Sequence, residues 1–549
     1  MVGQAEEQLA YGLRVAGQAG GILLVQLLEH GISVVGRLLA QHMLYEIEIV
    51  GALHPIACRV ESAPYPSVLH RIGLLSLAKV TKIGEYTQAK RKKMYICGKY
   101  KKLFPMMDWR KLISAKRLGM EAYHNEGGDD RSDFLRDYDR LIFSAPFRRL
   151  QNKTQVFPLP GSIFVHNRLT HSLEVACVGR SLGNRVSRAL LKRHPELGDS
   201  LVGEIGSIVS AACLAHDLGN PPFGHSGERA ISAYFTEGKG RELREQLTET
   251  EWNDITHFEG NANAFRLLTH QFNGRRRGGF ALTYSTLASI VKYPYSSYYA
   301  GGKPKFGFFH TEADTFRAIA EELGLIRLSV EDEPLRYCRH PLVFLVEAAD
   351  DICYQMMDIE DAYKLKLLTT KEAKELYQLF FDEKKMSSVE KVFSFVSDHN
   401  EQIAYLRATV IGILINECTQ VFMENEEAIL DGRFEGALIN HISAPLSEAY
   451  QQCSKVAIEK IYRSRDVLDI ELAGFHVITT LLELMIDAVQ SPDKAYSQLL
   501  INRVSSQYDI KAPTLYGRTQ AVLDYISGMT DVFALDLFRK IKGNGLPAV

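Results

Sequence analysis

The sequence predicts an all-α, mainly helical protein. Apolar residues recur with helical spacing over most of the chain from residue 133 onward. The alternation of apolar and polar residues that indicates strands is confined to short pieces such as 306–309, and no repeat of fixed period is present. A chain of 549 residues can hold two or more domains, or one large helical domain with appendages.

The expected helices follow one another along the chain. Thr170 is predicted to cap a helix that runs through 173–178, because a Ser or Thr before apolar periodicity marks a helix start. An apolar second helix is expected at 205–215. A third is predicted to start with Pro341, a residue that helices tolerate in their first turn, and to run toward Ala362. Further amphipathic helices are expected at 371–395, 400–424, 446–463, 474–489 and 517–526.

Residues 1–105 differ from the remainder of the chain. They combine short apolar runs, prolines and a basic stretch without sustained helical periodicity, and a coherent pattern begins near Met107. We therefore expect them to be an extension outside the main fold, and hypothesise that they are upstream sequence that is not normally translated. A native N-terminal peptide beginning near Met107 would support this hypothesis, and one beginning at Met1 would contradict it.

The composition is typical of a reduced, cytoplasmic protein. The formal charge of −2 favours neither nucleic acid nor a membrane, and short basic clusters such as 90–93 and 275–277 are more often solvated loops than binding sites. The eight cysteines show no C-x-x-C spacing. Charged residues interrupt the apolar segment 20–39, which argues against a transmembrane helix, and the chain does not open with the basic region of a signal peptide.

The most informative motif is the pair His216-Asp217. It ends an apolar helical run and is followed by a turn rich in Gly and Pro that leads to His225. A buried Asp needs a partner, and a bound cation would account for both side chains. Together with His171 and Asp350 on two other helices, the pair provides two imidazoles and two carboxylates. This set suits Mn²⁺, Fe²⁺ or Co²⁺, with Mg²⁺ able to act through phosphate oxygens, and it indicates hydrolytic chemistry.

A second pattern lies on the third helix. Asp350, Tyr354 and Asp358 are spaced at i, i+4 and i+8, so they share one helix face over two turns. A ligand carboxylate, a phenol and a second carboxylate in register look like a sugar-binding edge. An ordinary tyrosine at the edge of a core is the alternative for Tyr354.

Five blocks of sequence resemble the HD-domain deoxynucleoside triphosphate triphosphohydrolases, and most closely the bacterial dGTPases. They read RRLQNKTQV at 148–156, RLTHSLE at 168–174, HDLGNPPFGH at 216–225, HFEGNA at 257–262 and EAADDICY at 347–354. The resemblance covers roughly 107–545 and does not extend to 1–105. It implies a helical HD domain at about 165–365 and additional C-terminal helices at about 366–549.

The resemblance also implies roles for individual residues. The metal ligands would be His171, His216, Asp217 and Asp350. The catalytic residues would be His225, Glu228 and His257, and the substrate contacts Gln155, Arg168, Lys292, Tyr293, Lys305, Tyr354 and Asp358. In this scheme Glu228 keeps His225 protonated, so that His225 can donate a proton to the leaving 5′-oxygen. Tyr354 would pack under the deoxyribose, and Asp358 would accept from its 3′-hydroxyl.

The implied reaction is the metal-dependent hydrolysis of dGTP, or of several dNTPs, to the deoxynucleoside and inorganic triphosphate. Relatives suggest a tetramer or hexamer and an allosteric dNTP or single-stranded DNA as further ligands. One alternative is another HD phosphohydrolase, acting on nucleoside monophosphates, cyclic nucleotides or alarmones, and the Tyr354/Asp358 register weighs against it. A second alternative is a nucleotide- or DNA-binding regulator with low turnover, and the intact ligand set weighs against that.

Overall fold

A computed structural model describes residues 106–122, 131–156, 165–300 and 305–544. The expected extension at 1–105, with the apolar segment 20–39 and the basic cluster 90–93, lies outside the described residues. The described part belongs to one compact unit, Pro105–Val549.

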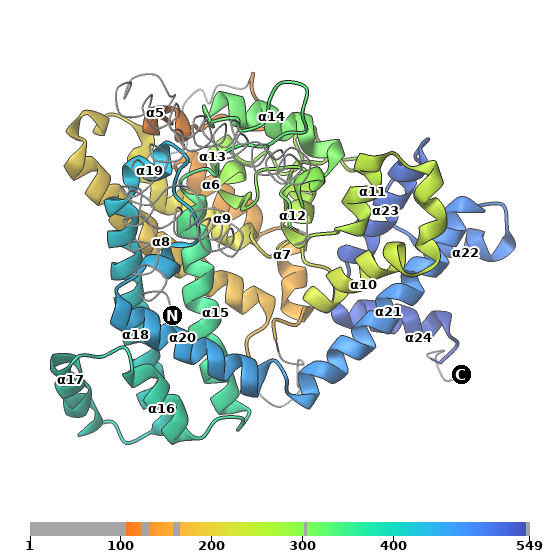
Figure 1. Ribbon diagram of the computed structural model, residues 1–549. Helices are drawn as coiled ribbons and strands as arrows, with labels where there is room; N and C mark the ends of the chain where they lie inside the picture. Colours follow the sequence, from red (N-terminus) through yellow and green to blue (C-terminus); the bar gives the residue numbers. More distant parts are fainter. Residues whose placement is uncertain (1–105, 123–130, 157–164, 301–304, 545–549) are drawn as a thin grey trace, which may run out of the picture. The chain divides into compact units, whose positions relative to one another are not determined.

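The prediction of an all-α fold is confirmed, since the described residues form helices and five isolated β-bridges but no strand (Figure 1). The first half contains α5 (Trp109–Leu112), α6 (Asp133–Ile142), α7 (Ala145–Arg149), α8 (Arg168–Arg193), α9 (Ile205–Ala215), α10 (His225–Thr236), α11 (Glu249–Thr256), α12 (Gly260–Thr269), α13 (Tyr284–Ile290), α14 (Ala313–Glu322) and α15 (Val343–Lys364). The second half contains α16 (Thr370–Gln378), α17 (Glu383–Phe393), α18 (His399–Glu424), α19 (Glu426–Leu430), α20 (Ala444–Val456), α21 (Arg465–Gln490), α22 (Ala495–Arg503), α23 (Leu515–Ser527) and α24 (Asp531–Ile541). Short 3-10 helices η1–η7 cover Leu150–Asn152, Pro195–Leu197, Leu201–Glu204, Lys239–Gln246, Ser297–Tyr299, His310–Glu312 and Leu438–His441, and a π-helical turn, η8, covers Ala457–Ile461.

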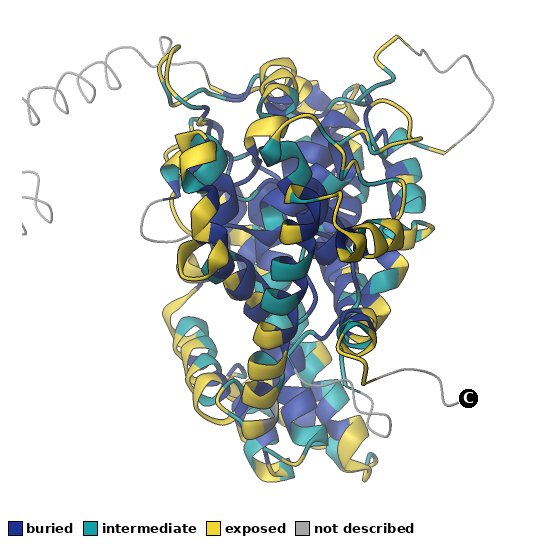
Figure 2. Ribbon diagram, turned by 90° about the vertical axis from the view of Figure 1, so that its right-hand side faces the viewer, coloured by how far each residue is buried: buried dark blue, intermediate teal, exposed yellow. Residues whose placement is uncertain are grey.

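Two apolar cores hold these helices together, and buried residues fill the interior of the ribbon (Figure 2). The larger core surrounds α9, which packs against α8, α13 and α15. Almost every residue of α9 is buried, and its central Ser210 satisfies its hydroxyl by donating to the carbonyl of Ala176. The smaller core joins α10 and α11 to the C-terminal helices α21, α23 and α24.

Helices α8 and α9 approach closely because glycines face each other. A Cβ atom on Gly183 would lie 2.8 Å from the Cα of Gly206, so a larger residue would push the two helices apart. The close contact also brings together His171, which α8 carries, and His216, which follows α9.

Several boundaries differ from the prediction. Asn167 rather than Thr170 caps α8, because the Asn167 side chain accepts the N–H of Thr170 while the Thr170 hydroxyl accepts the N–H of Asn167. The third helix begins at Val343, two residues after Pro341. The single helix expected at 371–395 is two helices, α16 and α17, and Asp382 caps the second. The strand-like piece 306–309 makes only one isolated bridge, between Phe308 and Ser296.

Two described helices, His399–Glu424 and Val467–Gln490, are long and apolar enough to cross a membrane. In their most apolar windows 44% and 50% of the residues are buried inside the fold. This is weak evidence for a span, because the core helices of globular proteins have the same length and composition.

Candidate functional site

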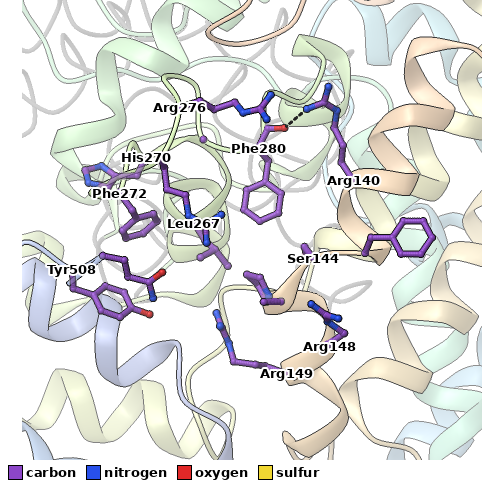
Figure 3. A pocket seen from close by; sticks show the side chains of 16 residues that line it. Arg140, Ser144, Arg148, Arg149, Leu267, His270, Phe272, Arg276, Phe280 and Tyr508 are labelled. Atoms are coloured by element: carbon purple, nitrogen blue, oxygen red, sulfur yellow. Dashed lines mark hydrogen bonds between the residues drawn. The ribbon is translucent and has the colours of Figure 1, made fainter. Parts of the chain in front are cut away.

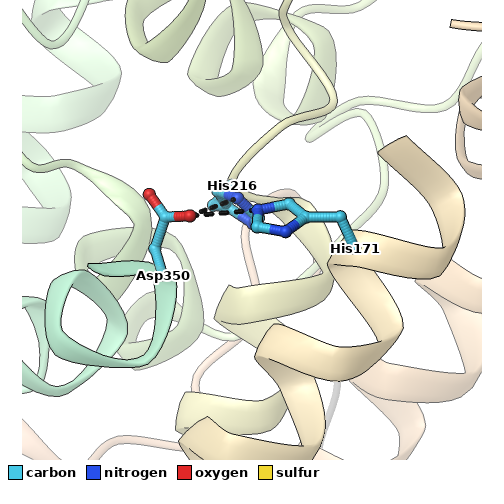
Figure 4. Close-up of side chains that lie close together, drawn as sticks. All are labelled: His171, His216 and Asp350. Carbon is cyan, nitrogen blue, oxygen red and sulfur yellow. Dashed lines mark hydrogen bonds and ion pairs between the residues drawn. The ribbon is translucent and has the colours of Figure 1, made fainter. Parts of the chain in front are cut away.

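Three helices bring together His171, His216 and Asp350 (Figure 4). His171 comes from the first turn of α8, His216 follows the last residue of α9, and Asp350 comes from the middle of α15. One ligand atom from each lies within 4.8 Å of the other two. Oδ1 of Asp350 is 3.0 Å from Nε2 of His171 and 3.6 Å from Nε2 of His216. The three side chains therefore converge on a volume the size of a metal ion.

The hydrogen bonds of His216 fix its tautomer. Its Nδ1 donates to the carbonyl oxygen of Cys213 at 2.6 Å, since a carbonyl can only accept. In the neutral ring the lone pair is then on Nε2, which is buried and has no hydrogen-bond partner among the described residues. A buried, unpaired ring nitrogen facing a carboxylate is the arrangement expected of a histidine ligand that its backbone contact orients. The donor set fits a divalent first-row cation.

The electrostatic field at this site favours positive charge. Burial opposes a charge on His216, but Asp217 and Asp350 outweigh it and raise its pKa to about 9. Burial also opposes a charge on Asp350 and would raise its pKa. The nearby imidazoles of His216 and His171 outweigh this effect and hold the pKa of Asp350 well below its usual range. Such a field stabilises a bound cation directly.

Asp217 lies at the edge of the cluster. Its Oδ1 is 3.7 Å from Nε2 of His216, whereas its Oδ2 accepts from Nη1 of Arg168 at 2.8 Å. Asn220 donates a further hydrogen bond to Oδ1. Burial opposes ionisation of Asp217, but Arg168 and His216 lower its pKa below the ordinary value. The carboxylate of Asp217 is thus ionised and close to the cluster, but His171, His216 and Asp350 lie closer to one another than Asp217 lies to them.

A cavity of 310 Å³ opens next to the cluster. Most of the predicted site residues line it, and they come from four of the five sequence blocks, from the start of α10 and from the segments after α13. They are Gln155, Arg168, His216, Asp217, His225, Glu228, Lys292, Tyr293, Lys305, Asp350 and Tyr354. His171, His257 and Asp358 are not among the lining residues. Oε1 of Gln155 is buried without a hydrogen-bond partner in the described part, so the cavity wall offers a free acceptor.

His225 and Glu228 form a pair at the start of α10. Nδ1 of His225 lies 2.8 Å from Oε2 of Glu228, as the i, i+3 spacing predicts, and Oε1 of Glu228 accepts the N–H of Gly260 at 2.7 Å. The His225 side chain is 71% exposed, whereas Glu228 is buried. Burial alone would raise the pKa of Glu228, but the contact with His225 and the charge of Lys305 lower it. An ionised Glu228 holds the ring with its Nε2 free.

Two lysines on the cavity wall are paired with buried carboxylates. Nζ of Lys292 is 3.1 Å from Oε1 of Glu347, and Nζ of Lys305 is 2.5 Å from Oε1 of Glu259. Burial lowers the pKa of Lys292, but Glu347 more than compensates and the pKa is raised. Neither Glu259 nor Glu347 was predicted as a site residue. Their places inside the HFEGNA and EAADDICY blocks were the available signal.

The expected sugar-binding edge on α15 includes a residue that was not predicted. Tyr354 lines the cavity, and the ring of Tyr462 stacks on it with centroids 5.9 Å apart. The Tyr462 hydroxyl donates to Oδ2 of Asp358 at 2.6 Å. Burial raises the pKa of Asp358 to about 7, and the hydrogen bond from Tyr462 opposes that rise. Because Tyr462 follows the π-helical turn η8, more than a hundred residues away in sequence, no local pattern indicated this contact.

His257 is placed differently from the other predicted catalytic residues. It caps the C-terminal end of α11, and its Nδ1 donates to the carbonyl of Asn253 at 3.0 Å. The ring is half-buried and outside the cavity lining. Its catalytic role therefore stays a prediction from the resemblance.

A second cavity, of 500 Å³, includes two residues of the basic cluster 275–277 (Figure 3). Five arginines line it, namely Arg140, Arg148, Arg149, Arg275 and Arg276, and no Asp or Glu is among its described lining residues. The aromatic rings of Phe272, Phe280 and Tyr508 complete the wall. Burial lowers the pKa of Arg149, and the neighbouring charge of Arg275 lowers it further. Such crowding of like charges favours an anionic ligand.

The chain matches two protein families and many known proteins. The HD domain matches residues 168–277, and the phosphohydrolase-associated domain matches residues 440–540. A deoxyguanosinetriphosphate triphosphohydrolase-like protein of Pseudomonas aeruginosa is 38% identical over 456 residues, which cover 80% of this chain and 100% of that protein. The like-named protein of Synechocystis sp. is 38% identical over 454 residues, with the same coverage.

A third relative carries the enzyme name itself, without the ending "-like protein". The deoxyguanosinetriphosphate triphosphohydrolase of Yersinia enterocolitica is 30% identical over 517 residues, which cover 79% of this chain and 99% of that protein. With a helical fold, a His/Asp cluster beside a polar cavity, and these matches along most of its length, the chain belongs to the HD-domain family of deoxyguanosinetriphosphate triphosphohydrolases and their like-named relatives.

Proposed function

We propose that the protein hydrolyses dGTP, and with it other deoxynucleoside triphosphates, to the deoxynucleoside and inorganic triphosphate in the cytoplasm. The observation that carries this proposal is the convergence of His171, His216 and Asp350 beside a cavity whose wall holds the His225–Glu228 pair. A cation site alone indicates a hydrolase. The adjacent lysines and the tyrosine on α15 favour a substrate with a polyphosphate and a deoxyribose.

In the proposed mechanism His171, His216, Asp217 and Asp350 hold a divalent cation, Mn²⁺, Mg²⁺, Fe²⁺ or Co²⁺. A cation bound there supplies Lewis-acid stabilisation of phosphate charge and acidifies water. Water attacks the α-phosphorus, and the bond from phosphorus to the 5′-oxygen breaks. His225 donates a proton from Nε2 to that oxygen, while Glu228 orients the ring through its contact with Nδ1, and general acid catalysis of this kind contributes about 10²–10⁴-fold.

The remaining predicted residues bind and orient the substrate in this scheme. Arg168, Lys292, Tyr293 and Lys305 contact the phosphates, since no glycine-rich phosphate loop is present in the sequence. Tyr354 packs against the deoxyribose, Asp358 accepts from the 3′-hydroxyl, and Gln155 uses its free acceptor toward the nucleoside. The catalytic region is residues 106–549, with its HD domain at about 165–365.

Product analysis tests the reaction. Purified protein is incubated with each dNTP, NTP and dNMP in the presence of Mn²⁺ or Mg²⁺, and the products are identified. We expect deoxyguanosine and inorganic triphosphate, loss of activity with a chelator, and recovery with Mn²⁺. Release of pyrophosphate or monophosphate instead of triphosphate would contradict the proposal.

A variant tests the site. His216→Ala should lose at least about 100-fold in kcat, because it removes a cation ligand and its orienting contact. His441→Ala is the matched control, since this exposed histidine lies outside the cavity lining, where it hydrogen-bonds the Glu435 carbonyl at 3.0 Å and packs on the ring of Phe434. Normal dGTP hydrolysis by His216→Ala would show that the reaction takes place elsewhere.

A second, regulatory role is favoured by the cavity lined with arginines. We propose that it takes an anionic accessory ligand, a dNTP or single-stranded DNA, in a homo-oligomer of four or six subunits. Arg148→Glu should weaken activation of dGTP hydrolysis by a second dNTP or by an oligonucleotide while leaving unstimulated turnover intact. Light scattering with and without each ligand measures the oligomeric state. Equal stimulation of wild type and Arg148→Glu by the second dNTP or the oligonucleotide would refute this role for the cavity.

A further inference from the structure

The turn that precedes His225 has an unfavourable backbone conformation. Phe223 has φ of 61° and Gly224 has φ of 57°. Glycine adopts positive φ readily, but a bulky aromatic residue does so only where its surroundings hold it in place. Gly224 is followed at once by His225, the first residue of α10. The contacts that hold this turn therefore also determine the position of the His225 backbone, from which its side chain extends.

The carboxylate of Asp531 binds the backbone of the turn. Asp531 is the first residue of α24 and is only 7% exposed. Its Oδ1 accepts the N–H of Phe223 at 2.9 Å, and its Oδ2 accepts the N–H of Thr154 at 2.8 Å. One carboxylate thus ties the turn to the segment that precedes Gln155. Both hydrogen bonds involve a charged acceptor, which makes them stronger than neutral ones.

A second C-terminal helix, α21, packs against the ring of Phe223. A Cβ atom on Gly474, in α21, would lie 2.5 Å from Cγ and 2.7 Å from Cβ of Phe223. Only a glycine leaves room for the ring at this place. Helix α21 also contacts the start of α10, where the Ser226 hydroxyl donates to the carbonyl of Glu471 at 2.8 Å. The C-terminal helices therefore hold the backbone, the ring and the following residue.

We propose that Asp531 is a positioning residue, which holds the turn of Phe223 and Gly224 so that His225 faces the cavity. The C-terminal region, which matches the phosphohydrolase-associated domain at 440–540, would then complete the catalytic site of the HD domain. This inference rests on the proposed role of His225 as the general acid. It assigns no contact between Asp531 and the substrate.

The test compares two leaving groups. In dGTP the 5′-alkoxide needs a proton as it departs, whereas an analogue with sulfur at the bridging 5′-position releases a thiolate that needs none. Water forms the new bond to phosphorus in both cases, and the electron pair of the broken bond leaves with oxygen or with sulfur. A protein whose general acid is misplaced should therefore be slow on dGTP and nearly normal on the sulfur analogue.

Three variants are compared with wild type on both substrates. Asp531→Asn offers one acceptor oxygen in place of two, Gly474→Ala displaces the Phe223 ring, and His225→Ala removes the acid itself. We expect kcat for dGTP to fall by about 100-fold or more in His225→Ala, within the range for general acids. We expect a fall of about 10-fold or more in the other two, since misplacement removes part of the same effect. KM should stay within about threefold, and all three should approach wild type on the sulfur analogue.

Two controls have matched chemistry. Asp536→Asn changes an exposed carboxylate on the same helix, whose partner is Lys540 at 2.7 Å. Gly412→Ala adds a methyl group in α18, where nothing lies within 4 Å of the new atom. Both should hydrolyse dGTP and the analogue as wild type does.

Each other outcome has a distinct meaning. If Asp531→Asn loses activity equally on both substrates, or no more than Asp536→Asn on dGTP, the positioning role is wrong while the proposed reaction stands. If His225→Ala is not rescued by sulfur, His225 is not the general acid, and the inference fails with that assignment. Additive losses in the double variant Asp531→Asn/Gly474→Ala would also contradict it, because both changes should act through the same turn.

Discussion

At the scale of single residues, the chemistry of the site depends on partners far away in sequence. Asp358 is buried, which raises its pKa to about 7, and Tyr462 limits the rise by donating to Oδ2. The same tyrosine stacks on Tyr354. The predicted sugar-binding edge on α15 is therefore oriented by a side chain from the C-terminal part of the chain.

Replacing Tyr462 tests this dependence. In Tyr462→Phe the carboxyl of Asp358 loses its donor, so its pKa should rise and more of it should be protonated at pH 7. A protonated carboxyl is a weaker acceptor for a 3′-hydroxyl, and we expect KM for dGTP to rise by about 3- to 10-fold, the effect of one hydrogen bond. Raising the pH to 8.5 should reduce the excess. Tyr496→Phe, at a 51% exposed position, is the control, and a pH-independent KM in Tyr462→Phe would contradict the explanation.

At the scale of elements, a buried carboxylate joins α11 to α23. Oδ1 of Asp254 accepts from Ser297 at 2.6 Å, and Oδ2 accepts from the N–H of His310 at 2.8 Å and from the hydroxyl of Tyr516 at 2.5 Å. Burial raises the pKa of Asp254 to about 6 in spite of these donors. The folded protein therefore binds a proton here between pH 4 and 6 that the unfolded chain has released.

This difference predicts a pH dependence of stability. A group whose pKa is higher in the folded state stabilises the fold fully below its unfolded value, 3.8, and that contribution is lost as the pH rises through about 6. Between pH 4 and 7 the free energy of unfolding of wild type should fall, relative to Asp254→Asn, by roughly 2 kcal/mol, most of the roughly 3 kcal/mol that the whole shift is worth at 1.36 kcal/mol per pKa unit. Denaturant unfolding of both proteins at the two pH values measures it. A difference that stays constant with pH would rule out titration of Asp254.

At the scale of the whole molecule, the described helices form a unit with its own cores. Met107 and Trp109 are buried at its start, where the N–H of Met107 donates to the carbonyl of Leu430 and the Trp109 indole donates to Glu426 at 3.0 Å. The relatives from Pseudomonas aeruginosa and Synechocystis are matched over their full length by 80% of this chain.

We expect a chain that begins at Met107 to keep the catalytic properties of the full chain. Its kcat and KM for dGTP should agree within about twofold and its Tm within a few degrees, because the contacts that anchor Met107 and Trp109 remain. A chain that begins at Leu112 is the comparison, since it loses both buried residues and should be less stable. A large loss of activity on removing 1–106 would show that the extension belongs to the working enzyme.

The sequence predicted the long helices and most of the cavity wall, but not all of the helix boundaries and not the partners of the site residues. The helix expected at 205–215 is confirmed, because the apolar run there forms a buried helix and the Gly/Pro-rich turn after it ends the helix. The cap of α8 was wrong because Asn167 and Thr170 bond reciprocally, and either residue alone looks like a cap. Tyr462, Asp531 and Glu347 were missed because their importance depends on contacts between distant segments.

What the sequence determined by itself is the set of chemical groups: two histidines and two aspartates on three helical segments, a His/Glu pair one turn apart, and a helical chain to carry them. Helical periodicity and fixed spacing are local properties, so they can be read before the chain folds. The tertiary structure decided which groups meet. It brought His171, His216 and Asp350 within 4.8 Å of one another, left Asp217 beside Arg168, and placed Asp531 against the turn before His225. Those distances depend on how buried helices pack, and packing is a property of the whole core rather than of any segment.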